Sequence, residues 1–370
     1  MAKRVFAVIL SGGSGERFWP LSTPDRPKQF LTVFGGKSLI RQAVDRLRGV
    51  VPIDRVLVIT SEALVSATRE ELPELPERNI VAEPCRRDTA AAVATACGVV
   101  EARGGAEAVG AILTADHLMG DVKAFRRVLK DACRAAAASA SIVTMGVRPN
   151  HPATGFGYIR VGKPLPLGTQ TVFFRAAKFV EKPDEATARR YLATGKYVWN
   201  AGMFVWRAST MKAALAERAP ALAELEREVA AAAEPAEVLA RRYPELPKIS
   251  IDYAVMEKAG NILVSRGDFG WDDVGTWAAA DRHLRTDARR NVAKGVVTLL
   301  DCENTVAVAE GPEIAALGVK DLVVVTTKDH VLVAAKDRVQ DLKRILAERT
   351  SLNHPEVFDG VKVKTSKKST

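Results

Sequence analysis

The sequence predicts an α/β protein in which a doubly wound, mostly parallel sheet of Rossmann-like type is followed by a small C-terminal β domain. Three observations predict this class. Short β-branched runs alternate with amphipathic stretches over the first 150 residues, as in βαβ units. Alanine-rich segments follow, and closely spaced short strands come after Asn291. With 370 residues, 47% of them hydrophobic, the chain is long enough to bury a core and enclose a site.

The first half contains five predicted strands joined by four predicted helices. Each helical stretch is long enough to cross over a parallel sheet. Ligands of such sheets bind beyond the carboxyl ends of the strands, so the loops after Leu10, Pro84 and Thr114 should converge on one crevice. The predicted strands span residues 4–10, 55–60, 79–84, 109–114 and 141–147, and the predicted helices span 38–48, 62–71, 88–103 and 121–138.

Composition divides the chain into three predicted parts. Residues 1–285 form the main domain, with a core over 1–150 and a substrate-binding part over 151–285. Residues 286–350 contain five short strands and a charged helix, which is typical of a β-helix-like domain or a small β cap. Residues 351–370 are a basic tail that we expect to be disordered and dispensable for catalysis.

The charge, apolar runs and cysteines narrow the class of partner. The net charge is +10, but the basic residues are interspersed with acidic ones or gathered in the tail, without the aromatic residues that stack bases. No apolar run approaches the ~20 residues needed to span a bilayer. The four cysteines are scattered, as in proteins of a reducing compartment. We therefore expect a cytoplasmic protein that binds neither nucleic acid nor membrane.

A glycine-rich segment, SGGSGERFWP, directly follows the first predicted strand. Because Gly12, Gly13 and Gly15 lack Cβ atoms, backbone N–H groups can approach phosphate oxygens closely. Arg17 and the later Lys28 bring positive charge to the same oxygens. The segment predicts a triphosphate site, and a tight strand-to-helix turn with surface charges is the plainer alternative.

Two other nucleotide motifs do not fit the letters. The dinucleotide fingerprint GxGxxG requires glycine where Phe18 stands. A Walker A loop ending at Gly36, Lys37 and Ser38 requires its first glycine where Leu31 stands. A nicotinamide-dependent dehydrogenase and a P-loop enzyme are therefore not expected.

Further motifs follow the glycine-rich segment in a fixed order. The set resembles the signature of the sugar-nucleotide pyrophosphorylases, and specifically that of mannose-1-phosphate guanylyltransferases, a family of nucleotidyltransferases. The resemblance spans most of residues 7–277. Its motifs are GGSGERFWPLS, RPKQFL, EP with RDTA at 83–90, TADH at 114–117, FVEKP at 179–183, WNAGMF at 199–204, SIDYAVMEK at 250–258 and WDDVGTW at 271–277.

The resemblance implies transfer of GMP from GTP to α-D-mannose 1-phosphate, giving GDP-mannose and pyrophosphate. A sugar-phosphate oxygen attacks the α-phosphorus in line. Since a phosphate monoester has a second pKa near ~6, the nucleophile is already an anion and needs no general base. The enzyme has to supply cations, so the resemblance assigns catalysis to Arg17, Lys28 and Lys182, and a Mg²⁺ ion to Asp116 and Asp273.

The remaining site residues are also implied by the resemblance. Asp272 ranks second as a metal-site residue. The family usually has asparagine where Asp88 stands, and Asp88 can serve as the N-cap of the helix that it opens. The implied nucleotide-binding residues are Leu10, Ser11, Gly12, Gly13, Gly15, Glu83, Arg87 and Thr89, and the implied sugar-phosphate-binding residues are Gly157, Glu181, Lys182 and Asn200.

Two alternatives stay open. One is a pyrophosphorylase for another pair of sugar 1-phosphate and nucleoside triphosphate. The other is a catalytically inert, nucleotidyltransferase-like regulatory subunit. The retention of the catalytic cations and of both metal-site aspartates argues against this alternative. A fused phosphomannose isomerase is not expected after the β domain, and the oligomeric state is open, with a homodimer among the alternatives.

Overall fold

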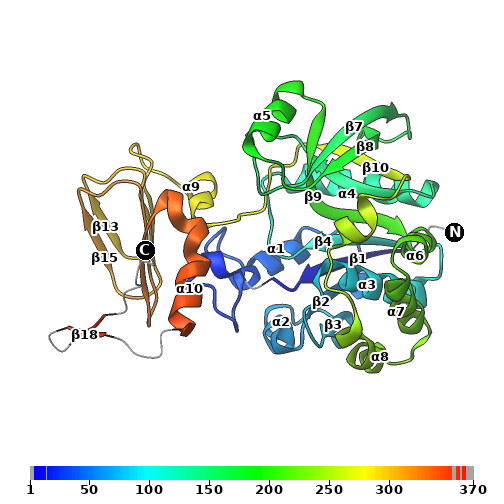
Figure 1. Cartoon of the computed structure of the whole chain (residues 1–370), viewed down its shortest axis with the longest axis horizontal. Helices are drawn as coiled ribbons and strands as arrows, with labels where there is room; N and C mark the ends of the chain where they lie inside the picture. Colours follow the sequence, from blue (N-terminus) through cyan, green and yellow to red (C-terminus); the bar gives the residue numbers. More distant parts are fainter. Residues whose placement is uncertain (1–3, 14, 352–355, 359–360, 364–370) are drawn as a thin grey trace. The chain divides into compact units, whose positions relative to one another are not determined.

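The computed structural model describes residues 4–13, 15–351, 356–358 and 361–363 (Figure 1). The chain forms two compact units. The first contains the residues up to Gly12 together with Lys37–Asp273, and the second contains Gly13–Gly36 together with the chain from Val274 onward. Most of the glycine-rich segment therefore belongs to the second compact unit.

A nine-stranded mixed sheet within the described residues forms the frame of the first unit. Its order is β3-β2-β1-β4-β9-β6-β10-β8-β7. The pairings among β3, β2, β1 and β4 are parallel, which agrees with the predicted core. The strands are β1 Val5–Ser11, β2 Val56–Ser61, β3 Ile80–Glu83, β4 Val109–Thr114, β6 Ile142–Val147, β7 Tyr158–Leu165, β8 Phe173–Val180, β9 Tyr197–Arg207 and β10 Ile262–Gly267.

Strand β9 makes the sheet mixed. It lies antiparallel between β4 and β6, so that Asn200 pairs with Gly146 and Arg207 pairs with Val109. The beginning of β9 therefore lies at the carboxyl ends of its parallel neighbours, where ligands of such sheets bind. The α/β class is confirmed, and a strand from the predicted substrate-binding part completes the core sheet.

The helices of the first unit cover this sheet. Ser38, Asp121 and Asp184 cap α1, α4 and α5 by accepting a backbone N–H bond in the first turn. The alanine-rich α3 lies together with α6 and α7 (Figure 1), and a Cβ added at Gly98 would lie 2.6 Å from the Glu226 carbonyl oxygen. The helices are α1 Leu39–Asp45, α2 Val65–Glu71, α3 Asp88–Gly104, α4 Val122–Ala138, α5 Glu185–Thr194, α6 Ala208–Arg218, α7 Pro220–Ala231 and α8 Pro235–Arg242.

The second unit contains a β-helix-like stack. Strands β12, β14 and β16 pair in parallel, and so do β13 and β15. The stacked Val292, Val306 and Val323 share one register and are fully buried. This repeated parallel pairing decides between the two predicted alternatives. The strands are β12 Val292–Lys294, β13 Val297–Leu300, β14 Val306–Ala309, β15 Ile314–Leu317, β16 Leu322–Thr326 and the antiparallel β17 Val331–Ala335.

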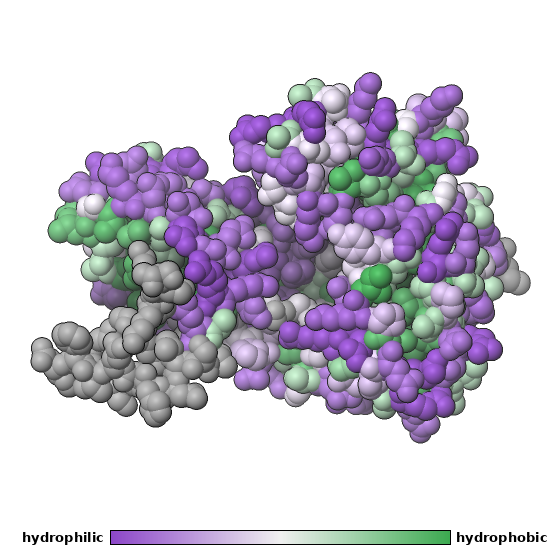
Figure 2. Space-filling model, viewed as in Figure 1, coloured by the Kyte–Doolittle hydropathy of each residue, from purple (hydrophilic) through white to green (hydrophobic). Residues whose placement is uncertain are grey.

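Apolar side chains on the β-helix are exposed. Figure 2 shows hydrophobic residues gathered over β13 and β15, where Val296, Leu300 and Leu317 are exposed. A short helix, α9 (Ala280–His283), precedes the stack, and a 3-10 turn with α10 (Leu342–Ser351) follows it. Of the predicted tail, the structure describes the paired strands β18 (Glu356–Phe358) and β19 (Val361–Val363). The rest of that prediction lies outside the described residues.

Candidate active site

The first residues of the predicted nucleotide loop lie beside the ends of β2, β3 and β4. Thr60 donates its hydroxyl to the Ser11 carbonyl oxygen over 3.0 Å, and the Ala115 N–H donates to the Leu10 carbonyl oxygen over 3.1 Å. A Cβ added at Gly12 would lie 3.5 Å from Glu83 Oε2. The structure thus brings Gly12 and Glu83 together at the carboxyl edge of the sheet, as the sequence predicts.

Gly13 and the residues after it belong to the second unit. Gly15 has a left-handed backbone with φ of 60°, and a Cβ there would lie 2.6 Å from the Lys28 backbone nitrogen. Glycine is therefore required at this position both by conformation and by space. Arg17 is exposed, whereas Lys28 is only 6% exposed and its Nζ lies 6.0 Å from the centre of the Phe18 ring.

The ring of Phe18 is fully buried. The ring centre lies 5.8 Å from that of Phe34 and 5.1 Å from that of Trp277. The Trp277 indole in turn donates to the Trp19 carbonyl oxygen over 3.1 Å. Aromatic packing around Phe18 thus fixes the backbone next to Arg17.

The two predicted metal-site aspartates lie at one end of a small ribbon in the first unit. Strand β5 (Leu118–Met119) pairs antiparallel with β11 (Trp271–Asp272), with Asp272 opposite Leu118. Asp116 stands two residues before β5 and Asp273 stands one residue after β11. Antiparallel pairing therefore carries both aspartates to the same end of the ribbon.

His117 joins the strands that carry these aspartates. The Trp271 indole donates to His117 Nδ1 over 3.0 Å, and His117 Nε2 lies 3.7 Å from Asp116 Oδ1. The Arg46 guanidinium donates to the His117 carbonyl oxygen over 2.8 Å. Burial lowers the pKa of Arg46 to about 10, and the charge of Asp116 opposes that shift. The acidic end of the ribbon is therefore held in place by a buried cation.

The donor set at this end fits Mg²⁺. Asp116 retains 34% side-chain exposure, and Asp273 is partly exposed. The described residues contain no group of three or more His, Cys, Asp and Glu side chains able to hold a metal. Mg²⁺ commonly takes one or two protein carboxylates, with water and substrate phosphate completing its shell, so a pair of aspartates is sufficient.

The predicted sugar-phosphate residues converge on one another. A Cβ added at Gly157 would lie 2.5 Å from Glu181 Oε2, and the Gly157 carbonyl oxygen accepts the Asn200 N–H over 2.8 Å. The Asn200 side-chain oxygen accepts the Thr144 hydroxyl and the Gly202 N–H, each over 3.2 Å. Strands β7, β8 and β9 thus bring Gly157, Glu181 and Asn200 to one place.

Asp252 completes this cluster, although the sequence analysis assigned it no role. The Asn200 side-chain nitrogen donates to Asp252 Oδ1 over 2.8 Å. Asp252 opens a short π-helix (Asp252–Met256), a form that is frequent at functional sites. Burial and then the nearby charge of Glu181 raise the pKa of Asp252 to about 6. The SIDYAVMEK motif contains this residue, but its partner Asn200 lies 52 positions away in the sequence.

Lys182 contacts the same cluster. Its Nζ lies 3.0 Å from Glu181 Oε1, and this hydrogen bond raises the pKa of Lys182. The Lys182 side chain is 63% exposed, so the ammonium remains accessible to a ligand. Its position thus agrees with the predicted contact to a phosphate.

The base-side residues differ in how they use their polar groups. The Tyr243 hydroxyl donates to Glu83 Oε1, and Glu83 is the last residue of β3. The Arg87 guanidinium donates to the Tyr243 carbonyl oxygen over 3.0 Å and to the Pro244 carbonyl oxygen. The Thr89 hydroxyl accepts the Ile251 N–H over 3.0 Å. Arg87 and Thr89 therefore hold the start of α3 against the segment 243–251.

Asp88 does not act as the N-cap of α3, because it is the first helical residue. It has a left-handed φ of 63°, and its side chain accepts the Thr89 N–H over 2.7 Å. Asparagine and aspartate are the non-glycine residues that adopt this conformation most readily. Aspartate in place of the usual asparagine therefore preserves the backbone at the start of α3.

Three predicted motifs contain a non-glycine residue with positive φ. These residues are Asp88 at 63°, Lys182 at 44° and Val274 at 45°. A β-branched valine is a rare occupant of this region, and such strain gathers at functional sites. The base-side loop, the sugar-phosphate motif and the metal turn thus each contain one such residue, and four others lie outside the motifs, at Arg290, Asp301, Asn304 and Asp321.

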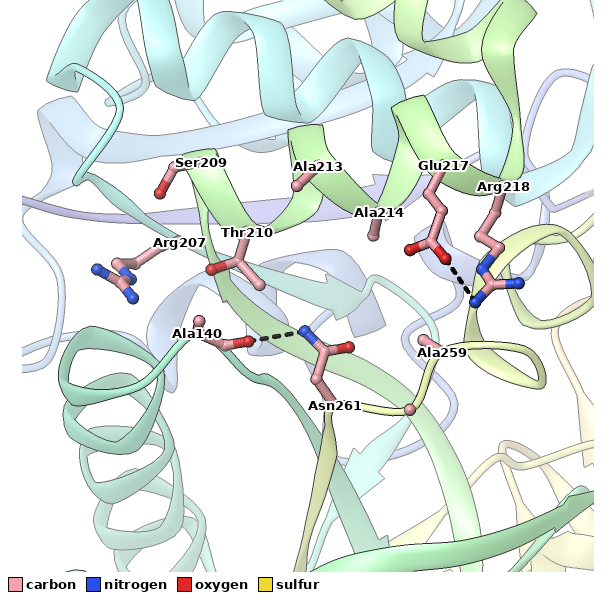
Figure 3. Close-up of a pocket in the computed structure, with 11 residues that line it drawn as sticks. Ala140, Arg207, Ser209, Thr210, Ala213, Ala214, Glu217, Arg218, Ala259 and Asn261 are labelled. Atoms are coloured by element: carbon pink, nitrogen blue, oxygen red, sulfur yellow. Dashed lines mark hydrogen bonds and ion pairs between the residues drawn. The ribbon is translucent and has the colours of Figure 1, made fainter.

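The cavity drawn in Figure 3 lies elsewhere in the first unit. It has a volume of about 480 Å³ and lies between α6 and the segment Ala259–Asn261. Arg207, at the end of β9, pairs with Glu107 over 2.9 Å, and Arg218 pairs with Glu217 over 2.7 Å. Because Arg207 is paired with Val109, the cavity faces the amino end of β4 and does not belong to the candidate site.

Comparisons with known proteins agree with these motifs. A family model described as nucleotidyl transferase matches residues 6–288, and one described as a MannoseP isomerase/GMP-like beta-helix domain matches residues 295–348. A mannose-1-phosphate guanylyltransferase of Escherichia coli (strain K12) is 36% identical over 352 residues, which cover 93% of this chain and 73% of that protein. The alginate biosynthesis protein AlgA of Pseudomonas aeruginosa is 39% identical over 366 residues, which cover 95% of this chain and 74% of that protein.

A solved structure is similar over almost its whole length. It is described as a mannose-1-phosphate geranyltransferase from Thermus thermophilus and is 37% identical to this chain. The TM-score is 0.85, and the match covers 94% of this chain and 99% of that chain. Separately, no helix in the described part of the chain is long and apolar enough to cross a membrane.

Proposed function

This chain belongs to the nucleotidyl transferase family, and within it to the mannose-1-phosphate guanylyltransferases, and we propose that it transfers GMP from GTP to α-D-mannose 1-phosphate. An oxygen of the sugar phosphate attacks the α-phosphorus of GTP. The bond from that phosphorus to the bridging oxygen of the β-phosphate breaks, and pyrophosphate leaves with the electron pair. The products are GDP-mannose and pyrophosphate.

One observation carries the proposal: the predicted sugar-binding residues meet at the edge where the ligand of such a sheet binds. The Asn200 side chain donates to Asp252, its backbone N–H donates to the Gly157 carbonyl oxygen, and Glu181 lies against Gly157. The Asn200 side-chain oxygen accepts two hydrogen bonds, and one of its two side-chain N–H groups donates to Asp252. Because an amide nitrogen has two donors, the second N–H can bind a ligand. This set can accept and donate hydrogen bonds to the hydroxyls of a pyranose.

The cations carry the chemistry, because two anions have to meet. Arg17 and Lys28 bind the triphosphate and stabilise the charge that develops at the α-phosphoryl group, and Lys182 holds the sugar phosphate. Pre-organised donors of this kind contribute ~10²–10³ in rate. The nucleophile is an anion at neutral pH, so the chain's part is alignment and charge neutralisation.

Asp116 and Asp273 would hold Mg²⁺, which is our proposal for the metal. When bound, the ion neutralises phosphate charge and helps to align the reacting groups. His117 and Arg46 hold the ribbon end that carries Asp116. We also propose a cytoplasmic enzyme, since all four cysteines are free thiols.

The test follows the product directly by phosphorus NMR. Purified protein with Mg²⁺, GTP and mannose 1-phosphate should produce the two diphosphate resonances of GDP-mannose together with pyrophosphate. GDP-mannose and pyrophosphate should give GTP in reverse, because one phosphoanhydride is exchanged for another. EDTA should stop both reactions. Absence of GDP-mannose with the metal-loaded protein would contradict the proposal.

A further inference from the structure

Tyr243 lies outside every predicted motif, yet it is buried against the base side of the site. It opens the 3-10 turn Tyr243–Glu245 and is fully buried. Its hydroxyl donates to Glu83 Oε1. The Arg87 guanidinium fixes the turn by donating to the carbonyl oxygens of Tyr243 and Pro244. The position of the phenol is therefore determined by the fold.

The two oxygens of the Glu83 carboxylate have different surroundings. Oε1 accepts the Tyr243 hydroxyl. Oε2 lies 3.5 Å from the place where a Cβ on Gly12 would stand, so it faces the glycine loop that is proposed to bind the nucleotide. Tyr243 therefore orients the carboxylate with one oxygen towards the fold and the other towards the loop.

The same hydrogen bond influences the charge of Glu83. Burial raises the pKa of Glu83, and the bond from Tyr243 opposes that rise. Burial and the charge of Glu83 raise the pKa of Tyr243, so the phenol stays protonated and remains a donor. Thr95 on α3 and the Cys85 thiol also influence the pKa of Tyr243. Loss of the phenolic hydroxyl should thus favour protonation of Glu83.

The protonation state of the Glu83 carboxyl decides which base can form matching hydrogen bonds with it. Guanine presents two N–H donors side by side on its Watson–Crick edge, whereas adenine presents one donor beside an acceptor. An ionised carboxylate offers only acceptors, and a protonated carboxyl carries one O–H donor. An ionised Glu83 therefore matches guanine and mismatches adenine.

We propose that Tyr243 is a positioning residue for guanine selection, which acts by orienting the Glu83 carboxylate. This inference rests on the proposed function, because it assumes that GTP is the nucleotide substrate. It adds a residue from the segment after α8 to the base side.

The experiment compares Tyr243→Phe with the wild type across pH. The readout is the ratio of kcat/KM for GTP to that for ATP, each with mannose 1-phosphate, since the titration of the triphosphate cancels in this ratio. Loss of one bond to a charged group should lower the ratio about tenfold near neutral pH. The fall of the ratio on the acid side should move to higher pH, and KM for mannose 1-phosphate should stay unchanged. Tyr191→Phe, the same chemical change on α5, should leave the ratio at the wild-type value.

A second variant separates positioning from folding. Glu83→Gln should lower the ratio and remove its acid-side fall, and adding Tyr243→Phe to Glu83→Gln should lower the ratio no further. Equal losses with GTP and ATP, or an unchanged ratio in Tyr243→Phe or Glu83→Gln, would overturn the inference. A wild type that prefers another nucleotide would instead refute the proposed function, so the two failures are distinguishable.

Discussion

The base side and the sugar side of the site use predicted residues in opposite ways. On the sugar side, Asn200 and Glu181 contact residues of the same cluster, and Lys182 remains exposed beside them. On the base side, the Arg87 guanidinium and the Thr89 hydroxyl are engaged with backbone groups of the segment 243–251. Membership of a motif therefore does not distinguish a residue that contacts substrate from one that holds the frame.

The difference also indicates which side chains on each side can contact the sugar or the base. The sugar side has several polar groups around Asp252, whereas on the base side we propose that recognition depends on Glu83, which accepts the Tyr243 hydroxyl. We expect sugar selectivity to depend on several side chains and base selectivity to depend on few. The following substitutions test this contrast.

The largest effect should come from the proposed metal-site aspartates, because a metal bound there would act on the phosphates of both substrates. Asp116→Asn and Asp273→Asn should each lower kcat with GTP and mannose 1-phosphate about a hundredfold or more, since charge stabilisation at the phosphates is lost. The same loss should appear with every substrate pair. Asp54→Asn, at an exposed aspartate, is the control. Activity within about threefold of the wild type would show that the two carboxylates do not hold the metal.

The next effect should be confined to the sugar side. Asn200→Ala removes the amide that Thr144, Gly202 and Asp252 fix, and it should raise KM for mannose 1-phosphate about tenfold. KM for GTP should change by less than about twofold. Steady-state kinetics with each substrate varied in turn measures both values. An equal rise in the two KM values would show that Asn200 influences the binding of nucleotide as much as the binding of sugar phosphate.

The protonation of Asp252 should give the sugar side a pH dependence. Because its pKa is raised to about 6, Asp252 is an ionised acceptor above that pH and is protonated below it. The affinity for GDP-mannose should therefore weaken as the pH falls through about 6. GDP-mannose is the suitable probe because its diphosphate does not titrate in this range. Calorimetric titrations should show the weakening in the wild type and not in Asp252→Asn, and an identical pH dependence of both proteins would contradict the assignment.

The smallest effect on turnover is expected at Arg87. Arg87→Gln removes bonds from a charged group to two backbone carbonyl oxygens, and it should lower the free energy of unfolding by about 1–3 kcal/mol. The ratio of kcat/KM for GTP to ATP should fall less than in Tyr243→Phe. Urea unfolding and the nucleotide ratio together check this prediction. A large loss of selectivity with unchanged stability would assign Arg87 to the base itself.

Local sequence patterns predicted much of the fold. Runs of β-branched residues placed β1, β2, β3, β4 and β6 within about one residue, because a buried parallel strand needs such residues throughout. The antiparallel position of β9 between β4 and β6 was not predicted, since pairing between distant segments leaves no local pattern. The β-helix was one of two alternatives until the parallel register of Val292, Val306 and Val323 decided it.

The candidate site was also predicted only in part from the sequence. The resemblance of the motifs to the family identified Glu181, Asn200 and Asp116 as candidates. The partners that define their geometry lie far along the chain: Asp252 is 52 positions from Asn200, and Tyr243 is 160 positions from Glu83. The role of Arg87 was hidden for the same reason, because its backbone partners are 156 and 157 positions away.

The most direct test of the account is a matrix of kcat/KM values from pyrophosphate release. GTP, ATP, UTP and dTTP are each paired with mannose 1-phosphate and with glucose 1-phosphate, for the wild type, Asn200→Ala and Tyr243→Phe. The account predicts that the wild type prefers GTP with mannose 1-phosphate, that Asn200→Ala weakens the preference for mannose alone, and that Tyr243→Phe weakens the preference for guanine alone. A wild-type preference for another pair, or the loss of both preferences in either variant, would contradict it.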